Sequence, residues 1–190
     1  MMRRWLLALS LLPTLALAAA TPAAKQPTVI FDTTLGQIVI ALDADKAPKS
    51  VANFLEYVRD GSYNGSLFHR VIPGFVVQGG GYDSHYQPLP TRSPVENESN
   101  NGLSNVRGSL AMARTANPDS ATRQFYFNLR DNTALDGNQV ASGYTVFGQV
   151  TKGLEVLDAI AAKPTGVSPI LGAPDVPVEP LQIIKASISQ

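Results

Sequence analysis

Residues 68–81, FHRVIPGFVVQGGG, constrain the fold more than any other stretch of the chain. Two runs of β-forming residues flank Pro73-Gly74, which predicts two short strands joined by a turn. Arg70 lies inside the first run, and burying a cation among apolar residues is costly unless it has a partner or a task. Gln78 precedes three glycines, where the backbone can bend freely. The segment therefore predicts a β-hairpin whose arginine either reaches solvent or serves a site.

The N-terminus has the order of a secretory signal peptide. Two arginines precede the apolar stretch Trp5–Leu17, and small residues follow it. The apolar stretch is shorter than the roughly 20 residues that a membrane-spanning helix needs. We therefore expect residues 1–20 to be a signal peptide, cleaved after Ala18 or Ala20, rather than a membrane anchor.

The rest of the chain predicts one exported domain. We expect residues 21–27 to be a flexible leader and residues 28–190 to form a single globular domain. A bacterial periplasm is the expected compartment, with no stable membrane association after cleavage, and we expect a monomer. Fifteen basic and fifteen acidic residues balance, so the composition gives no reason to expect nucleic-acid binding.

Residue types that commonly carry catalysis are scarce. The chain has no cysteine, which excludes disulfides, thiol nucleophiles, zinc–thiolate sites and a lipoprotein anchor. Its two histidines are too few for an evident metal cluster, and we expect neither a metal nor a cofactor. His69 is interpreted as structural, and His85 lies in a polar loop.

Hydrophobic spacing predicts a β-rich domain with two helices. Alternating apolar residues predict a hairpin from residues 28–33 and 37–42. Residues 47–60 show helical spacing, with a proline near the start and a glycine after the end. Further strands are expected at 109–113, 124–128, 144–150 and 181–188, a short strand near 95–98, and a second helix at 153–162. Five prolines between Pro164 and Pro180 predict that this segment has no regular structure.

FHRVIPGFVVQGG is similar to the signature of the cyclophilin-type peptidyl-prolyl cis-trans isomerases. APKSVANFLEYV resembles the first helix of that family. GSLAMAR, RQFYFNL and YTVFGQVTKGLEVLDAI resemble its later blocks in the same order, so the likeness runs from about residue 28 to residue 188. The resemblance implies a mainly β fold, a closed eight-stranded antiparallel barrel capped by two α-helices, with the site on the outer face. It also implies an enzyme that accelerates rotation about X–Pro bonds during the folding of exported proteins. Its partners would be unfolded or proline-containing polypeptides.

The resemblance implies a single catalytic residue, Arg70, which donates toward the prolyl nitrogen. Phe75 and Val76 match positions lining a proline pocket. The remaining positions that the resemblance assigns to substrate binding are Gln78, Ala113, Arg114, Gln124, Tyr126, Leu135 and Tyr144. Among these, the two glutamines would hold the substrate backbone or orient the arginine, and residues 113–114 would border the peptide through their main chain.

Several positions depart from the best-known eukaryotic pattern of the family. Val76 stands where methionine is common, and Tyr126 replaces a phenylalanine. Ala134 stands where cyclosporin-sensitive members have an indole ring, and Tyr144 stands where histidine is common. The loop 136–143 is longer. The residues expected to carry the activity are nevertheless present.

Two other functional classes remain open. A proline-peptide binding module, or holdase, would keep Phe75 and the pocket but would not need Arg70. A small-molecule carrier would need an open lumen in the barrel, whereas the many large apolar side chains predict a filled one.

Overall fold

The computed structural model describes residues 26–138 and 140–189, so the predicted signal peptide and residues 21–25 of the leader lie outside the described residues. The strands are β1 (Thr28–Thr33), β2 (Gly36–Leu42), β3 (Arg70–Ile72), β4 (Val76–Gly79), β5 (Ser109–Met112), β6 (Phe125–Asn128), β7 (Val146–Lys152), β8 (Thr165–Gly166), β9 (Val176–Pro177) and β10 (Ile183–Ser189). The α-helices are α1 (Pro48–Arg59) and α2 (Leu154–Ala161), and short 3-10 turns lie at Pro118–Ser120 and Thr133–Leu135.

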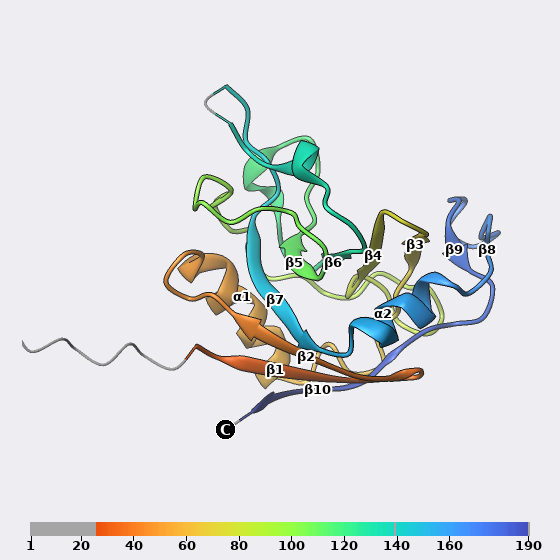
Figure 1. The fold of residues 1–190 in the computed structure, drawn as a ribbon. Coiled ribbons are helices and arrows are strands. Elements are labelled where there is room, and N and C mark those ends of the chain that lie inside the picture. The colour runs from red at the N-terminus through yellow and green to blue at the C-terminus, as the bar shows by residue number, and fades with distance from the viewer. Residues whose placement is uncertain (1–25, 139, 190) are drawn as a thin grey trace, which may run out of the picture.

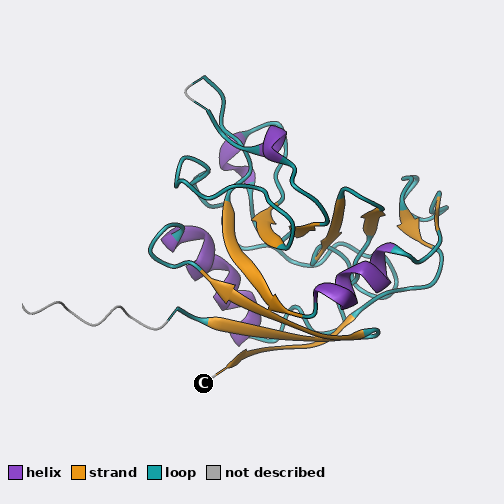
Figure 2. Cartoon of the chain, viewed as in Figure 1, coloured by secondary structure: helices purple, strands orange, loops and turns teal. Residues whose placement is uncertain are grey.

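Eight of these strands form one antiparallel sheet in the order β10-β1-β2-β7-β5-β6-β4-β3 (Figure 1). The sheet curls around a common interior, and the two α-helices lie at opposite sides of it (Figure 2). The first strand of the chain pairs with the last, with Thr28 opposite Ser189. The mainly β prediction with two helices is therefore confirmed.

The expected closure of the barrel is wrong, because the edge strands β10 and β3 do not pair with each other. The backbone N–H of Val71 in β3 instead donates to the carbonyl of Asp175, at 2.8 Å, in the segment that leads into β9. Residues before β3, rather than β3 itself, reach the segment around β10, as where the Phe68 N–H donates to the Leu181 carbonyl at 2.9 Å. The edge of β3 is thus occupied by a neighbouring segment, and the sheet stays open.

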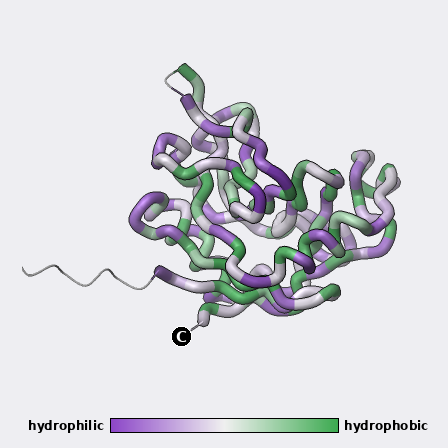
Figure 3. The backbone as a smooth tube through the Cα atoms, in the orientation of Figure 1, coloured by the Kyte–Doolittle hydropathy of each residue, from purple (hydrophilic) through white to green (hydrophobic). Residues whose placement is uncertain are grey.

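Aromatic rings fill the interior of the curled sheet. The large buried rings include those of Phe31, Phe54, Phe125, Phe127 and Phe147. Their ring centroids lie between 5.1 and 6.4 Å apart, the usual range for packed aromatic pairs. Apolar and polar residues alternate along the backbone in Figure 3, as expected for strands with one buried face. Among the described residues, side chains fill the interior where a carrier barrel would need an open lumen.

The first helix follows its sequence signals. Pro48 occupies the first turn of α1, where its missing N–H costs nothing. Val51, Phe54 and Val58 are buried along one stripe, and Gly61 follows the helix with a positive φ of 73°. A left-handed residue after the last turn is a common way to end a helix, and glycine adopts it without strain.

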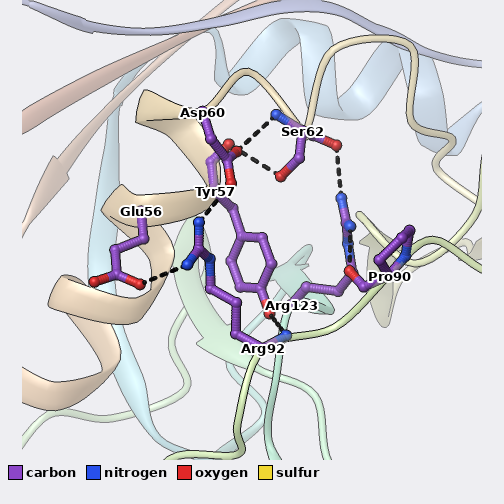
Figure 4. A network of polar contacts seen from close by, with 7 residues as sticks. All are labelled: Glu56, Tyr57, Asp60, Ser62, Pro90, Arg92 and Arg123. Atoms are coloured by element: carbon purple, nitrogen blue, oxygen red, sulfur yellow. Dashed lines mark hydrogen bonds and ion pairs between the residues drawn. The ribbon is translucent and has the colours of Figure 1, made fainter.

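Arg123 is the largest fully buried side chain of the described residues and is 1% exposed. Its guanidinium donates to the backbone carbonyls of Ser62 and Pro90, at 2.6 and 2.8 Å (Figure 4). It also donates to the carbonyl of Gly80, at 2.5 Å. It also lies over the ring of Tyr57, at 5.0 Å from the centroid. Three loops that are distant in the sequence are therefore fastened by one side chain at the end of β4.

Two sequence expectations about loops need correction. The proline-rich segment does contain regular structure, since β8 and β9, of two residues each, pair in antiparallel fashion across the loop 167–175. The expected strand near 95–98 is reduced to an isolated bridge between Val95 and Ala121. Within residues 26–138 and 140–189, neither helix combines the length and the apolar character that crossing a membrane requires.

Candidate active site

The strand register aligns one row of side chains across five neighbouring strands. Arg70 is opposite Gln78, Gln78 is opposite Tyr126, Tyr126 is opposite Ala111, and Ala111 is opposite Val146. Residues directly opposite each other in a sheet point to the same face. This row therefore brings residues from β3, β4, β6, β5 and β7 together on the outer face, away from the aromatic interior.

A pocket of about 170 Å³ opens on this row. It is lined by Arg70, Phe75, Val76, Gln78, Ala113, Arg114, Tyr126, Leu135 and Tyr144. The floor is apolar because Val76, Ala111, Tyr126 and Val146 form a buried cluster separate from the main core. Nine of the ten predicted site residues thus line one pocket, and the tenth, Gln124, lines an adjoining pocket that shares Gln78 with it.

A chain of amides holds Arg70 at the edge of the pocket. The Arg70 Nη1 donates to Oε1 of Gln78 at 3.4 Å, and Nε2 of Gln78 donates to Oε1 of Gln124 at 2.9 Å. The two glutamines therefore orient the arginine in this structure. The Arg70 side chain is half-buried, so its charge remains accessible from the pocket.

The glycines after Gln78 make room for this chain of amides. A Cβ atom on Gly81 would lie 2.5 Å from Nε2 of Gln124. Gly80 has a positive φ of 84°, and a Cβ there would lie 2.8 Å from the Phe125 ring and 3.1 Å from the Arg123 carbonyl. A side chain at Gly81 would therefore displace the Gln124 amide, and one at Gly80 would displace the Phe125 ring or the backbone at Arg123.

One wall of the pocket is a stack of Arg114, Tyr144 and Tyr126. The Arg114 guanidinium lies 4.5 Å from the centroid of the Tyr144 ring, which meets the Tyr126 ring edge-on at 5.8 Å. Arg114 also donates to the carbonyls of Ser142 and Gly143, at 2.8 and 3.2 Å. The sequence predicted a main-chain role for Arg114, but its side chain fastens the neighbouring loop to the rim of the pocket.

His69 lies beside Arg70 but faces the protein interior. It is 7% exposed, its ring packs edge-on against Tyr82 at 4.7 Å, and its Nδ1 has no hydrogen-bond partner among the described residues. Burial lowers the pKa of His69 to about 4. The imidazole is therefore neutral at ordinary pH. His85, in contrast, is exposed on its loop.

Sequence reasoning missed the buried side chains that support the pocket from below. These include Arg123 and three asparagines, Asn105, Asn128 and Asn132, all of which are buried. Asn105 and Asn132 lie in loops, where asparagine usually indicates a turn. Asn128 is the last residue of β6, and Arg123 lies just before that strand. Their burial depends on partners distant in the sequence, so no local pattern could have identified them.

Comparison with known proteins agrees with this geometry. Residues 28–188 match the family described as cyclophilin type peptidyl-prolyl cis-trans isomerase/CLD. Peptidyl-prolyl cis-trans isomerase A of Dickeya dadantii is 50% identical over 168 residues, which cover 86% of this chain and 88% of that protein. Peptidyl-prolyl cis-trans isomerase B of Escherichia coli is 47% identical over 165 residues, which cover 85% of this chain and 99% of that protein.

The fold is also similar to that of a solved structure. The crystal structure of a cyclophilin-type peptidyl-prolyl cis-trans isomerase from Cryptosporidium parvum has a TM-score of 0.72 to this chain at 24% sequence identity. It covers 87% of this chain and 98% of its own. At this identity the structural likeness shows the shared fold, while the family match and the bacterial relatives show the relationship. The chain belongs to the cyclophilin-type peptidyl-prolyl cis-trans isomerases, a family of enzymes.

Proposed function

We propose that this enzyme accelerates rotation about X–Pro bonds of exported polypeptides in the periplasm. The observation that carries the catalytic part of the proposal is the row that sets Arg70 at the edge of an apolar pocket. In a peptide substrate the pyrrolidine ring would enter the pocket between Phe75 and Tyr126, and the prolyl nitrogen would face Arg70.

The physical task is to stabilise a twisted amide. An X–Pro bond has partial double-bond character, which gives a barrier of about 18–20 kcal/mol, although cis and trans differ by only about 0.5–1 kcal/mol. No covalent bond is made or broken during rotation, so the reaction needs no nucleophile. The surface only has to bind the twisted form more tightly than either planar form.

Arg70 is suited to this task because twisting returns the lone pair to the prolyl nitrogen. A guanidinium that donates to this nitrogen stabilises the twisted amide and interacts weakly with the planar one. Gln78 accepts from Nη1 and is itself held by Gln124, which fixes the direction of the guanidinium before substrate arrives.

The decisive experiment measures cis-to-trans conversion of an Ala-Pro test peptide by the purified chain, by Arg70→Ala and by Arg70→Lys. We expect Arg70→Ala to lower kcat/KM by about 10²–10³, the usual effect of removing one donor to developing charge, while the peptide still binds. Arg59→Ala is the matched control, because Arg59 is an exposed arginine at the end of α1. Equal rates for the wild type and Arg70→Ala would contradict the proposal.

A holdase would give a different pattern. It would bind the Ala-Pro peptide through the pocket, but the wild type would not accelerate conversion above the spontaneous rate. The Cryptosporidium parvum cyclophilin was also solved in the presence of the dipeptide Ala-Pro, which supports the choice of test peptide.

The compartment is proposed from the N-terminal sequence alone. The charged, apolar and small-residue order of residues 1–20 supports export with cleavage. Slow X–Pro rotation, which takes tens to hundreds of seconds, would then limit the folding of proteins after export. N-terminal sequencing of the chain from a periplasmic fraction should begin at Ala19 or Thr21. A full-length chain in the membrane fraction would contradict cleavage, and sedimentation of the mature chain should show a monomer.

A further inference from the structure

A buried network of amides lies directly beneath the proline pocket. Asn105, Asn128 and Asn132 are 1%, 0% and 5% exposed. Nδ2 of Asn128 donates to Oδ1 of Asn105 at 3.1 Å, and Nδ2 of Asn132 donates to Oδ1 of Asn128 at 2.8 Å. These residues come from the loop before β5, from β6 and from the loop after β6, so the network joins both sides of the pocket.

The network reaches the lining of the pocket at two places. The hydroxyl of Tyr126 donates to Oδ1 of Asn105 at 2.8 Å. Nδ2 of Asn132 donates to the carbonyl of Phe75 at 3.0 Å. Burial raises the pKa of the Tyr126 phenol, which therefore stays protonated and keeps this donor. Two of the residues expected to contact the proline ring are thus held from behind.

Asp136 fixes the direction of this network. Its Oδ1 accepts from the backbone N–H of Asn105 at 2.7 Å and from Nδ2 of Asn105 at 2.8 Å. The Ser104 hydroxyl donates to the other carboxylate oxygen. A carboxylate can only accept, so it holds Nδ2 of Asn105 on its own side and turns Oδ1 toward Tyr126. Burial raises the pKa of Asp136, but these hydrogen bonds outweigh burial and hold the pKa below its ordinary value.

We propose that Asn105 and Asp136 are positioning residues of the proline pocket, acting through the hydroxyl of Tyr126 rather than by contact with substrate. The inference rests on the proposed function, since it assumes that the proline ring binds against Tyr126. Rotation of the Tyr126 ring would alter the width of the pocket, because this ring also packs edge-on against Tyr144. The network therefore sets substrate affinity, whereas Arg70 sets the rate of rotation of bound substrate.

The test is a double-mutant cycle on Asn105→Ala and Tyr126→Phe. Binding of an Ala-Pro peptide is measured by NMR titration, and turnover of bound peptide is measured by exchange spectroscopy on the same samples. In the wild-type background Asn105→Ala leaves a buried hydroxyl without its acceptor and should weaken binding about tenfold, with turnover within about twofold. In the Tyr126→Phe background no hydroxyl is present, and the same substitution should weaken binding by less than about threefold.

A general loss of structure would not give this pattern. An equal loss of affinity in both backgrounds, or unchanged affinity in a folded Asn105→Ala chain, would overturn the proposal. Asp136→Asn is the second variant, should Asn105→Ala not fold, and it should weaken binding in the same direction. Asp131→Asn is the matched control, because Asp131 accepts only the backbone N–H of Arg107 among the described contacts, at 2.8 Å, and should leave affinity unchanged.

The outcomes also separate this inference from the proposed function. A wild-type chain that binds the peptide without turnover would refute the isomerase proposal, yet the cycle on affinity would still test the positioning role. A wild-type chain that turns the peptide over, with no coupling between Asn105 and Tyr126, would refute the positioning role alone.

Discussion

Replacing Arg123 should strongly destabilise the fold, although the replacement removes a buried charge. Burying a guanidinium costs several kcal/mol in lost hydration, so its removal releases that penalty. Its removal, however, also leaves three backbone carbonyls without their hydrogen-bond donor, those of Ser62, Gly80 and Pro90. The sign of the change depends on how many of them water can reach.

The burial of these three carbonyls indicates how much stability the substitution should cost. Gly80 is buried, Ser62 is half-buried and Pro90 is exposed, so only the Gly80 carbonyl would be wholly deprived of a partner. An orphaned buried polar group costs about 1–3 kcal/mol, and breaking a buried charged contact by removing one partner typically costs about 3–5 kcal/mol. We therefore expect Arg123→Ala to lower the free energy of unfolding by about 3–4 kcal/mol. At this chain length, that corresponds to a fall in Tm of about 10 °C.

Urea denaturation of the purified chain is the appropriate assay, with an unchanged m-value as evidence that only stability changed. Arg123→Met separates the two effects, because methionine fills much of the space but donates no hydrogen bond. If the Met variant matched or exceeded the wild type in stability, the desolvation penalty would outweigh the three contacts and the reasoning would be refuted. Arg92→Ala is the control, since this neighbouring arginine pairs with Glu56 and Asp60 at the surface and should have a much smaller effect (Figure 4).

Two further predictions concern the neighbours of Arg70. The pKa of His69 is about 4 in the folded chain and about 6.5 in the unfolded chain. As the pH drops, the unfolded state therefore takes up the proton first. The free energy of unfolding should fall between pH 6.5 and pH 4. The loss in the free energy of unfolding should reach about 3 kcal/mol. Urea denaturation of His69→Gln across this pH range should show a weaker dependence of stability on pH than the wild type. The same dependence in both would show that the imidazole is not the cause. Gly81→Ala should lower kcat/KM about tenfold, because the new Cβ lies 2.5 Å from the Gln124 amide and displaces it from Gln78. Circular dichroism should show a retained fold, and unchanged activity would mean that the amides do not orient Arg70.

The elements with strong local signals were predictable from the sequence. The first hairpin, the helix that starts at Pro48 and the two strands around Pro73-Gly74 appear where spacing and turn residues place them. In each case the local pattern and the final packing favour the same conformation. The number of strands came from the family resemblance, because strands as short as β3 leave too little sequence pattern to be recognised and counted.

The closure of the sheet was not predictable, because it depends on competition for one strand edge. The alternation of apolar residues in the sequence cannot show that the N–H of Val71 donates its hydrogen bond to the Asp175 carbonyl rather than to another strand. The pairing of β8 with β9 was not predictable either. It forms despite Pro177, because proline is tolerated in an edge strand, where its missing N–H need not pair with a neighbouring strand.

The site was predictable where residues face the pocket, and not where they support it. The resemblance identified the nine residues that line one pocket. Asn105 and Arg123 escaped notice because each is defined by hydrogen bonds to loops far away in the sequence. Polar residues in loops usually face solvent, and only the assembled fold shows that these are enclosed.

The pairing of β1 with β10 has a consequence for synthesis and delivery of the chain. One edge of β1 pairs with β2 nearby in the sequence, but its other edge pairs only with β10, the last strand of the chain. In a chain that is still emerging, from a ribosome or through a membrane, that second edge of β1 has no partner until β10 has been released. Loss of a C-terminal segment that includes β10 should therefore expose one edge of β1 and promote aggregation, so the isomerase depends on its own last strand to stay in solution.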